Sequence, residues 1–241
     1  MGPKVNEPKP VALVTGARKG IGRSAVGYLL DRGYQVVGCS RRDADWEADG
    51  FSHVRADVAD ESQVRTLFRT IRQRYGRLDV AINNAAVTSM NHVLLTPAAS
   101  MAKMMNTNVV GTFLVSREAA KLMRRRRFGR IVNFSSMAVP LRLAGQSAYV
   151  ASKASVESLS QVMAREVADY GITVNVIGPS PIDTDMTRGL PPDKLEELVG
   201  ALSIGRMGTF ADVANILDFF LRPESDAVTG QVLYLGGIPN V

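Results

Sequence analysis

Residues 11–22 read Val-Ala-Leu-Val-Thr-Gly-Ala-Arg-Lys-Gly-Ile-Gly, and this stretch decides the fold. The apolar run at 11–15 predicts a short buried strand, and the apolar positions after it recur at helical spacing to about residue 32. A second apolar run, residues 35–39, predicts another strand. A strand, a glycine-rich turn, a helix and a strand in that order form a βαβ unit with parallel strands.

The glycines of this turn, Gly16, Gly20 and Gly22, suit a phosphate-binding loop. Glycine adopts positive φ, lets the backbone approach a ligand, and lets helix and strand pack closely. The start of the following helix presents unpaired N–H groups and the positive end of its dipole. The turn therefore predicts a pyrophosphate site, and the alternative is a glycine-rich turn that binds nothing.

Strand and helix patterns continue to alternate along the rest of the chain. Further strands are predicted at residues 52–56, 79–82, 130–134, 173–177 and 231–235, and long helices at 61–75, 100–127 and 149–170. This alternation predicts an α/β, Rossmann-like, doubly wound three-layer αβα sandwich with a mainly parallel seven-stranded sheet. We expect a flexible arm at residues 1–10 and a single domain at 11–241. The loop at 178–208 is predicted to be a substrate lid, because loops at strand carboxyl ends carry ligands in this architecture.

Composition and charge exclude several classes of protein. The 241 residues are 46% hydrophobic and 22% charged, which is ordinary for a globular protein, and no apolar run is long enough to span a membrane. The net charge of +6 allows an anionic ligand, and the arginine run 124–127 is interpreted as a solvated helix end. We expect a cytoplasmic protein with no metal, no nucleic-acid partner and no membrane partner. Its one cysteine, Cys39, is expected in the core.

The residues after the second strand indicate which dinucleotide is bound. An NAD-binding protein often has an acid there for the ribose 2′-hydroxyl. Here the sequence reads Ser40-Arg41-Arg42, and the first carboxylate, Asp43, comes later. Arg41, Arg42 and Lys19 suit a 2′-phosphate, so we predict NADP(H). The alternative is that they are exposed loop residues.

A pair of residues on the helix at 149–170 suggests acid–base chemistry. Tyr149 and Lys153 are four apart and share one face of the helix. A phenol with an ordinary pKa of about 10 is a poor catalyst at neutral pH, and a nearby ammonium lowers that pKa. Taken alone, the pair equally fits two amphipathic side chains on a solvated face.

Taken together, the ordered motifs resemble the classical short-chain dehydrogenase/reductase (SDR) family over residues 11–237. The matching motifs are Thr15-Gly16-x-x-x-Gly20-Ile21-Gly22, Asp57, Asn83-Asn84-Ala85, and the series Asn108, Ser136, Tyr149 and Lys153. The resemblance implies an enzyme that moves a hydride between a nicotinamide and a carbonyl or secondary alcohol.

The resemblance also assigns roles to individual residues. Tyr149 would transfer the proton, Lys153 would lower its pKa, Ser136 would bond the substrate oxygen, and Asn108 would hold a water of a proton relay. The implied cofactor-binding residues are Thr15, Gly16, Arg18, Lys19, Gly20, Ile21, Gly22, Ser40, Arg41, Arg42, Asp57, Val58, Asn84, Ala85, Tyr149, Lys153, Pro179, Ile182 and Thr184.

Within the family, the chain looks most like the 3-oxoacyl-thioester reductases, through motifs such as Arg127-x-Gly129-Arg130-Ile131 and Gly145-Gln146-x-x-Tyr149. Arg127 matches a position that docks an acyl carrier protein, whereas Tyr170 stands where a second basic residue is usual. The alternatives are a dehydrogenase of sugars, cyclic or other small secondary alcohols, and a cofactor-binding regulator without catalysis. The resemblance further implies a homotetramer formed through the helices at 100–127 and 149–170.

Overall fold

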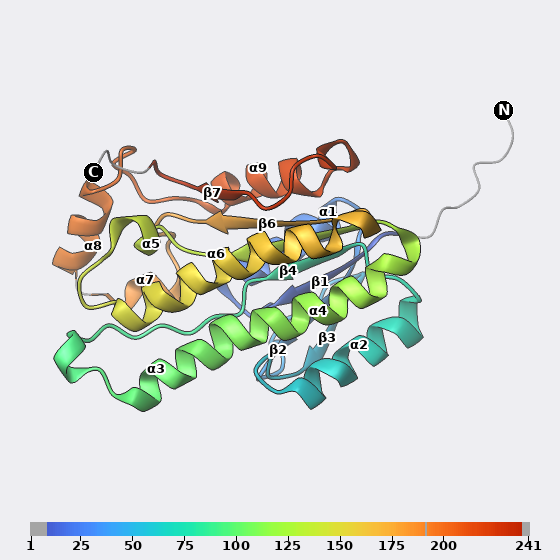
Figure 1. Ribbon diagram of the computed structural model, residues 1–241, viewed down its shortest axis with the longest axis horizontal. Coiled ribbons are helices and arrows are strands. Elements are labelled where there is room, and N and C mark those ends of the chain that lie inside the picture. Colours follow the sequence, from blue (N-terminus) through green and yellow to red (C-terminus); the bar gives the residue numbers. More distant parts are fainter. Residues whose placement is uncertain (1–8, 191, 238–241) are drawn as a thin grey trace, which may run out of the picture.

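The computed structural model describes residues 9–190 and 192–237, which fold as three layers with a central sheet (Figure 1). The sheet has seven strands: β1 (Val11–Thr15), β2 (Gln35–Ser40), β3 (Phe51–Arg55), β4 (Val80–Asn83), β5 (Gly129–Phe134), β6 (Ile172–Gly178) and β7 (Val232–Tyr234). They lie in the order β3-β2-β1-β4-β5-β6-β7, and every pair is parallel. The predicted doubly wound α/β fold is confirmed. The predicted arm falls mostly on residues 1–8, outside the described residues.

The strand order reverses direction between β1 and β4, and this places the candidate site. The chain builds outward from β1 to β2 and β3, then returns to β4 on the other side of β1. Thr15 at the end of β1 is in register with both Cys39 and Asn83. In open parallel sheets, ligands bind beyond the carboxyl ends of the strands at this point of reversal.

Helices cover both faces of the sheet and enclose two apolar cores (Figure 1). One core lies under α2 (Glu61–Tyr75), α4 (Gly111–Met123) and α6 (Ser147–Val167), with Leu67, Val115 and Met163 among its buried side chains. The other lies under α1 (Gly20–Asp31) and α9 (Phe210–Leu221), with Leu29 and Leu217 buried. Because both faces are covered, the strands read as continuous apolar runs.

The predicted continuous helix at 100–127 is interrupted in the structure. It begins as α3 (Ala98–Met104), widens into a π-helix, η2 (Met105–Val110), continues as α4, and ends in the 3-10 turn η3 (Arg124–Arg126). A π-helix pairs each carbonyl with an amide five residues on, so it admits an extra residue into a turn. Such turns occur often at functional sites, and this one contains Asn108.

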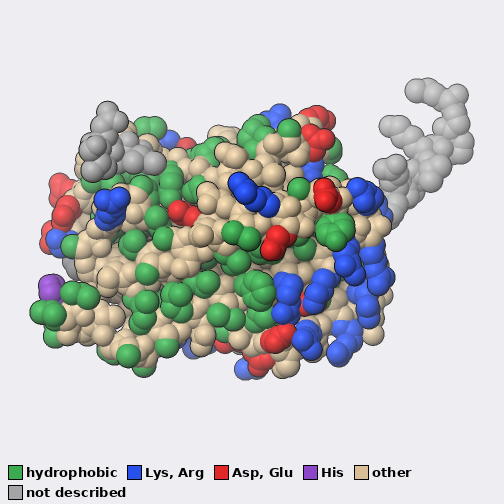
Figure 2. Space-filling model, viewed as in Figure 1, with side chains coloured by type: hydrophobic (Ala, Val, Ile, Leu, Met, Phe, Trp, Pro, Cys, Tyr) green, Lys and Arg blue, Asp and Glu red, His purple; other side chains and the backbone are tan. Residues whose placement is uncertain are grey.

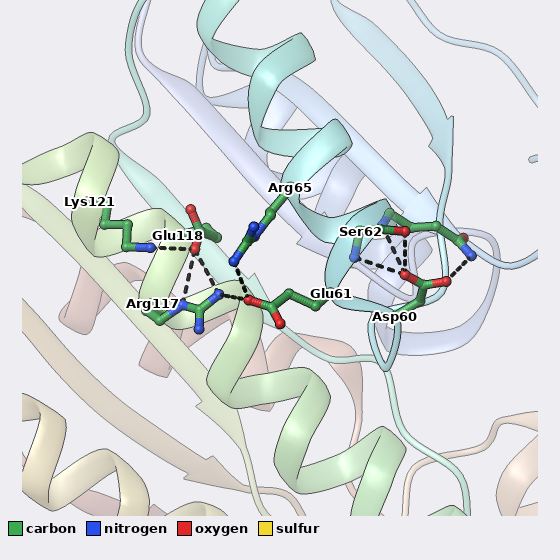
Figure 3. A network of polar contacts seen from close by, with 8 residues as sticks. Asp60, Glu61, Ser62, Arg65, Arg117, Glu118 and Lys121 are labelled. Atoms are coloured by element: carbon green, nitrogen blue, oxygen red, sulfur yellow. Dashed lines mark hydrogen bonds and ion pairs between the residues drawn. The ribbon is translucent and has the colours of Figure 1, made fainter.

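Charged side chains join α2 to α4 on the surface (Figure 3). Arg117 donates to Glu61 at 2.7 Å and pairs with Glu118 at 3.0 Å, and Glu61 also accepts from Arg65 at 2.8 Å. Asp60 caps the start of α2 by accepting from two backbone amides. We call these residues, with Lys121, the α2–α4 network.

On the face shown in Figure 2, basic and hydrophobic side chains gather at opposite ends of the molecule. Lys and Arg side chains gather over the end of α4, and hydrophobic side chains gather at the opposite end, over the 3-10 turn η1 (Val93–Leu95) and α3. Leu94 is 85% exposed. Within the described residues, no helix is long and apolar enough to cross a membrane.

Candidate active site

The glycine-rich turn connects β1 to α1 as the sequence predicts. Gly16 and Gly20 adopt φ of 68° and 57°, which favour glycine, and the Gly16 amide donates to the Cys39 carbonyl at 2.8 Å. A Cβ on Gly22 would lie 2.2 Å from the Gly16 carbonyl oxygen, so a side chain cannot fit there. Lys19 precedes α1 without a side-chain cap, and the helix therefore presents its first amides to a ligand.

Polar side chains from β1 and from the segment after β4 hold this turn in place. The Thr15 hydroxyl accepts from the amides of Asn84 at 3.1 Å and Ala85 at 3.0 Å. The Asn84 side chain donates to the carbonyls of Thr15 at 3.0 Å and Gly16 at 3.3 Å. Three of the predicted cofactor residues thus support the shape of the loop.

The end of β2 presents two arginines beside the turn. Arg41 and Arg42 are exposed, and the Ser40 hydroxyl donates to the Arg42 carbonyl at 2.6 Å, which shapes the loop that carries them. Trp46 closes this side: its indole N–H donates to the Arg18 carbonyl at 3.1 Å, and its ring stacks on Phe51.

Asp57 and Val58 follow β3 at the same edge of the sheet. The Asp57 carboxylate accepts from the Ala59 amide at 3.0 Å, and the Asp57 amide donates to Gln63 at 2.9 Å. Val58 is buried, and a Cβ on Gly111 would lie 2.7 Å from its methyl group.

The glycine-rich turn also contacts the segment predicted to be a lid. Lys19 forms an ion pair with Asp185 at the start of α7 (Asp185–Arg188), and this pair lowers the pKa of Asp185. Arg18 pairs instead with Asp45 at 3.3 Å. Thr184 lies over the turn, close to Gly20.

One cleft brings together residues from the turn, β5, α6 and residues 179–198. Three of the four predicted catalytic residues line it, namely Ser136, Tyr149 and Lys153. Five predicted cofactor residues line it as well: Ile21, Asn84, Pro179, Ile182 and Thr184. Apolar side chains from residues 137–198 form much of the rest, including Met137, Leu143, Met186, Leu190 and Leu198. The helix α8 (Pro192–Gly200) supplies the last of these.

Tyr149 is buried on the first turns of α6, and Ser136 follows the end of β5. Burial raises the pKa of the Tyr149 phenol, and a hydrogen bond with Ser136 acts in the opposite direction. The Ser136 hydroxyl also accepts from the Ala138 amide at 3.1 Å, which fixes its position. A serine hydroxyl and a tyrosine hydroxyl that bond each other can both reach one substrate oxygen.

Lys153 lies one helical turn beyond Tyr149 and is only 4% exposed. Its ammonium donates to the Phe134 carbonyl at 2.8 Å and lies 5.9 Å from the centre of the Tyr149 ring. Burial lowers the pKa of Lys153 to about 8, and the negative charge of Glu157 opposes that shift. Lys153 is therefore mostly charged at pH 7 and can stabilise a phenolate.

Asn108 lies behind the cleft and is not among its lining residues. It is 1% exposed, its amide exchanges hydrogen bonds with the backbone of Val87 at 2.8 and 2.9 Å, and it donates to the Ser152 hydroxyl at 2.9 Å. Ser152 in turn donates to the Tyr149 carbonyl at 2.7 Å. The Asn108 side chain thus connects the segment after β4 to the turn of α6 that carries Tyr149.

Two polar residues near the cleft were missed by the sequence analysis as site residues. Gln146 lines the cleft, is 7% exposed, and its Oε1 has no hydrogen-bond partner among the described residues. Glu157 lies one turn beyond Lys153 and accepts hydrogen bonds from Ser135 and Tyr234. The spacing of Tyr149, Lys153 and Glu157 was a signal that could have identified Glu157.

The residues present fit a nicotinamide dinucleotide. The uncapped start of α1 and the positive-φ glycines form a backbone cradle for a pyrophosphate, and Asn84, Ile182 and Thr184 extend that surface toward Tyr149 and Lys153. Ile21 of the turn lines the same cleft as the proton-transfer residues, so the cradle adjoins them, as hydride transfer to a carbonyl requires.

Comparison with known proteins agrees with this geometry. Residues 16–237 match the family model described as Enoyl-(Acyl carrier protein) reductase. The chain is 32% identical over 233 residues to the 3-oxoacyl-[acyl-carrier-protein] reductase FabG of Vibrio cholerae, covering 94% of this chain and 96% of that protein. It is 34% identical over 237 residues to the protein of the same description from Staphylococcus aureus, with the same coverage.

A solved structure of a dehydrogenase has the same fold. The ligand-free aldohexose dehydrogenase of Thermoplasma acidophilum superposes with a TM-score of 0.87 at 29% identity, covering 97% of this chain and 96% of that one. The site also agrees with what the family does, because SDR enzymes use a nicotinamide cofactor to interconvert CH–OH and carbonyl groups. The chain therefore belongs to the short-chain dehydrogenase/reductase family and is an oxidoreductase acting on CH–OH or carbonyl groups.

Proposed function

We propose that this enzyme is an NADP(H)-dependent reductase of 3-oxoacyl thioesters. The observation that carries the proposal is the convergence of Ser136, Tyr149 and Lys153 in one cleft beside the glycine-rich cradle. The bound nicotinamide supplies or accepts the hydride. The residues of the chain supply the proton and stabilise the charge that develops on oxygen.

Each residue has a role that follows from its position. Ser136 and Tyr149 hydrogen-bond the carbonyl oxygen, and Tyr149 donates its proton as negative charge develops there. The Lys153 ammonium stabilises the resulting phenolate. In the oxidation direction the phenolate removes the proton of the alcohol.

The hydrogen bonds of Asn108 support a positioning role in addition to the predicted relay. Its side chain is bonded to Val87 and Ser152, and Ser152 bonds the Tyr149 carbonyl, so we propose that Asn108 holds the Tyr149 turn of α6 in position. The water relay implied by the resemblance remains a separate prediction.

The preference for NADP(H) rests on Arg41 and Arg42. Both are exposed beside the cradle, and β2 ends without the carboxylate that would repel a 2′-phosphate. Lys19 adds a third cation, although it pairs with Asp185. We expect Arg41→Ala to raise the KM for NADPH about tenfold and leave the KM for NADH nearly unchanged. Arg69→Ala, an exposed arginine on α2, is the control, and equal use of NADPH and NADH by the wild type would contradict the preference.

The thioester substrate rests on the apolar cleft wall and on the two FabG relatives. Met137, Met186 and Leu198 offer an acyl chain an apolar surface, and residues 178–208 serve as the lid that carries part of it. An acyl carrier protein has basic side chains to meet at the end of α4 (Figure 2). Arg127 is exposed there, but its guanidinium donates to the Asp169 carbonyl at 2.7 Å, and Tyr170 is 40% exposed beside it.

A second candidate is a dehydrogenase of sugars or other polyols, and Gln146 favours it. A buried amide oxygen without a partner is costly, and a substrate hydroxyl next to the reacting carbon would satisfy it. The structural likeness to an aldohexose dehydrogenase supports the same alternative.

The deciding experiment follows the loss of NADPH absorbance with acetoacetyl thioesters and with sugar and cyclic ketones. We expect thioester turnover that Tyr149→Phe reduces about 10²–10⁴-fold with unchanged folding. Tyr75→Phe, a tyrosine outside the cleft, is the matched control. Unchanged turnover in Tyr149→Phe would refute the mechanism. Turnover only of the sugar and cyclic ketones, lost in Gln146→Leu, would establish the second candidate.

We also propose a cytoplasmic homotetramer. Val110, Phe113 and Val162 on α4, α6 and the adjoining π-helix are exposed apolar side chains that a four-helix contact would cover. Sedimentation at micromolar concentration tests this, and a monomer would contradict it.

A further inference from the structure

A carboxylate extends the line of catalytic side chains along α6. Tyr149, Lys153 and Glu157 follow one another at intervals of four residues, so they lie on one face of the helix. Glu157 is neither among the residues implied by the family resemblance nor among those lining the cleft.

Two strands hold the Glu157 carboxylate in place. The Ser135 hydroxyl, just past β5, and the Tyr234 hydroxyl, on β7, both donate to its Oε1, the latter at 2.6 Å. Ser135 is itself fixed, because its amide donates to the Ile177 carbonyl at 2.8 Å. The Tyr234 ring packs against Gly178, where a Cβ would lie 2.3 Å from the ring. The two hydrogen bonds therefore fix the position of the carboxylate.

Few titratable groups surround Lys153. Of the described residues that line the cleft, Tyr149 and Lys153 are the ionisable ones. The end of β5 presents the Phe134 carbonyl to Lys153, Ser136 lies just past that strand, and β7 presents Tyr234 to Glu157. Burial and the bond to Glu157 raise the pKa of Tyr234, so it stays a neutral donor. Glu157 is the carboxylate whose charge opposes the effect of burial on the pKa of Lys153.

We propose that Glu157 is a positioning residue whose fixed negative charge keeps Lys153 protonated and so extends catalysis to higher pH. This rests on the proposed role of Lys153 in stabilising the Tyr149 phenolate. Ser135 and Tyr234 fix the carboxylate one helical turn from Lys153, and the charge acts through space.

The test is the pH profile of ketone reduction by Glu157→Gln. Glutamine keeps an oxygen that accepts from Ser135 and Tyr234 but lacks the charge. We expect the alkaline fall in kcat to move about one unit to lower pH. At the pH where the kcat of the wild type has fallen to half its maximum, the kcat of the variant is then about fivefold lower. At pH 6 the kcat values of the variant and the wild type agree within about twofold. Glu166→Gln, which removes an exposed charge from the same helix, is expected to leave the profile unchanged.

Further variants separate charge from structure. Glu157→Asp retains the charge and is expected to restore most of the wild-type profile, whereas Tyr234→Phe removes one bond and is expected to move the midpoint less than half as far as Glu157→Gln. If Glu157→Asp and Glu157→Gln shift the profile equally, or Glu157→Gln does not shift it, the proposal is wrong. If Lys153→Met retains full activity, the proposed function fails instead, whatever Glu157→Gln does.

Discussion

On the surface between α2 and α4, Arg117 lies between two carboxylates (Figure 3). Lys153 in the cleft donates instead to a backbone carbonyl. The surface cations and anions are partly solvated and paired with one another. The Lys153 ammonium is buried, and the negative charge that raises its pKa is that of Glu157, one helical turn away.

This difference shows what exposed and buried charges contribute to stability and to catalysis. Exposed ion pairs gain little, because water screens them and ordering long side chains costs entropy. A buried ammonium is unfavourable for folding, but in a medium of low polarity it acts strongly on a neighbouring phenolate. Changes in the α2–α4 network should therefore affect stability and leave activity unchanged. Removing the Lys153 ammonium should lower activity and raise stability.

The largest effect is expected from Lys153→Met. Loss of the ammonium should reduce kcat at least about 10²-fold, because the Tyr149 phenolate loses its stabilising charge. Thermal unfolding should show the variant more stable by about 1–2 kcal/mol at pH 7, since the cost of burying a charge exceeds the lost bond to Phe134. The increase in the free energy of unfolding should be complete below pH about 8, where Lys153 of the folded wild type is charged. It should fade toward pH 10.5, where the lysine of the unfolded chain also loses its proton. If Lys153→Met is less stable than the wild type, the hydrogen bond to the Phe134 carbonyl stabilises the protein by more than burial of the charge costs.

The second effect is the pH dependence of the wild type. Burial lowers the pKa of Lys153 to about 8, so its charge is present at pH 7 and is lost as the pH rises. We expect kcat for reduction to be flat near neutrality and to fall about tenfold per pH unit above that value. A rate that stays flat to pH 10 would mean that the bound cofactor raises the pKa of Lys153 or that its charge is dispensable. Lys153→Met, which lacks the group, distinguishes the two.

A smaller effect is expected from Asp60→Ala at the start of α2. The Asp60 side chain accepts from the amides of Ser62 and Gln63, and its loss leaves these donors to water. We expect Tm to fall by about 2–4 °C with unchanged kcat. Asp60→Asn, which still accepts hydrogen bonds, is the control, and an equal fall in both variants would assign the effect to charge.

The smallest effect is expected from Arg117→Met. Although Arg117 contacts Glu61 and Glu118, we expect Tm to change by less than about 2 °C and the change to vanish in 1 M salt. A fall of 5 °C or more would show that the α2–α4 network contributes as a cooperative unit.

Local patterns in the sequence predicted the fold, and the family resemblance indicated several residues that line the candidate cleft. The apolar runs are recognisable because helices cover both faces of the parallel sheet, and the four-residue interval of Tyr149 and Lys153 is a property of any helix. The turn at Gly16 to Gly22 was predictable because positive φ and close packing require glycine.

Features that depend on distant contacts were not predictable. The π-helix at Met105–Val110 spans only six residues within a long helical pattern, and periodicity suggested one regular helix. The partners of Asn108 come from the segment after β4 and from α6, and those of Glu157 are 22 and 77 residues away in the chain. A sequence shows which side chains can bond but not which strands bring them together.

The contact between Gly178 and Tyr234 has an evolutionary consequence. Because a Cβ at residue 178 would overlap the Tyr234 ring, the two positions are free to diverge only as a pair. A descendant with a larger residue at 178 would have to give up the aromatic ring, and with it a donor to Glu157. Mutational drift at the end of β6 would thereby change the working pH of an enzyme whose reacting groups had stayed the same.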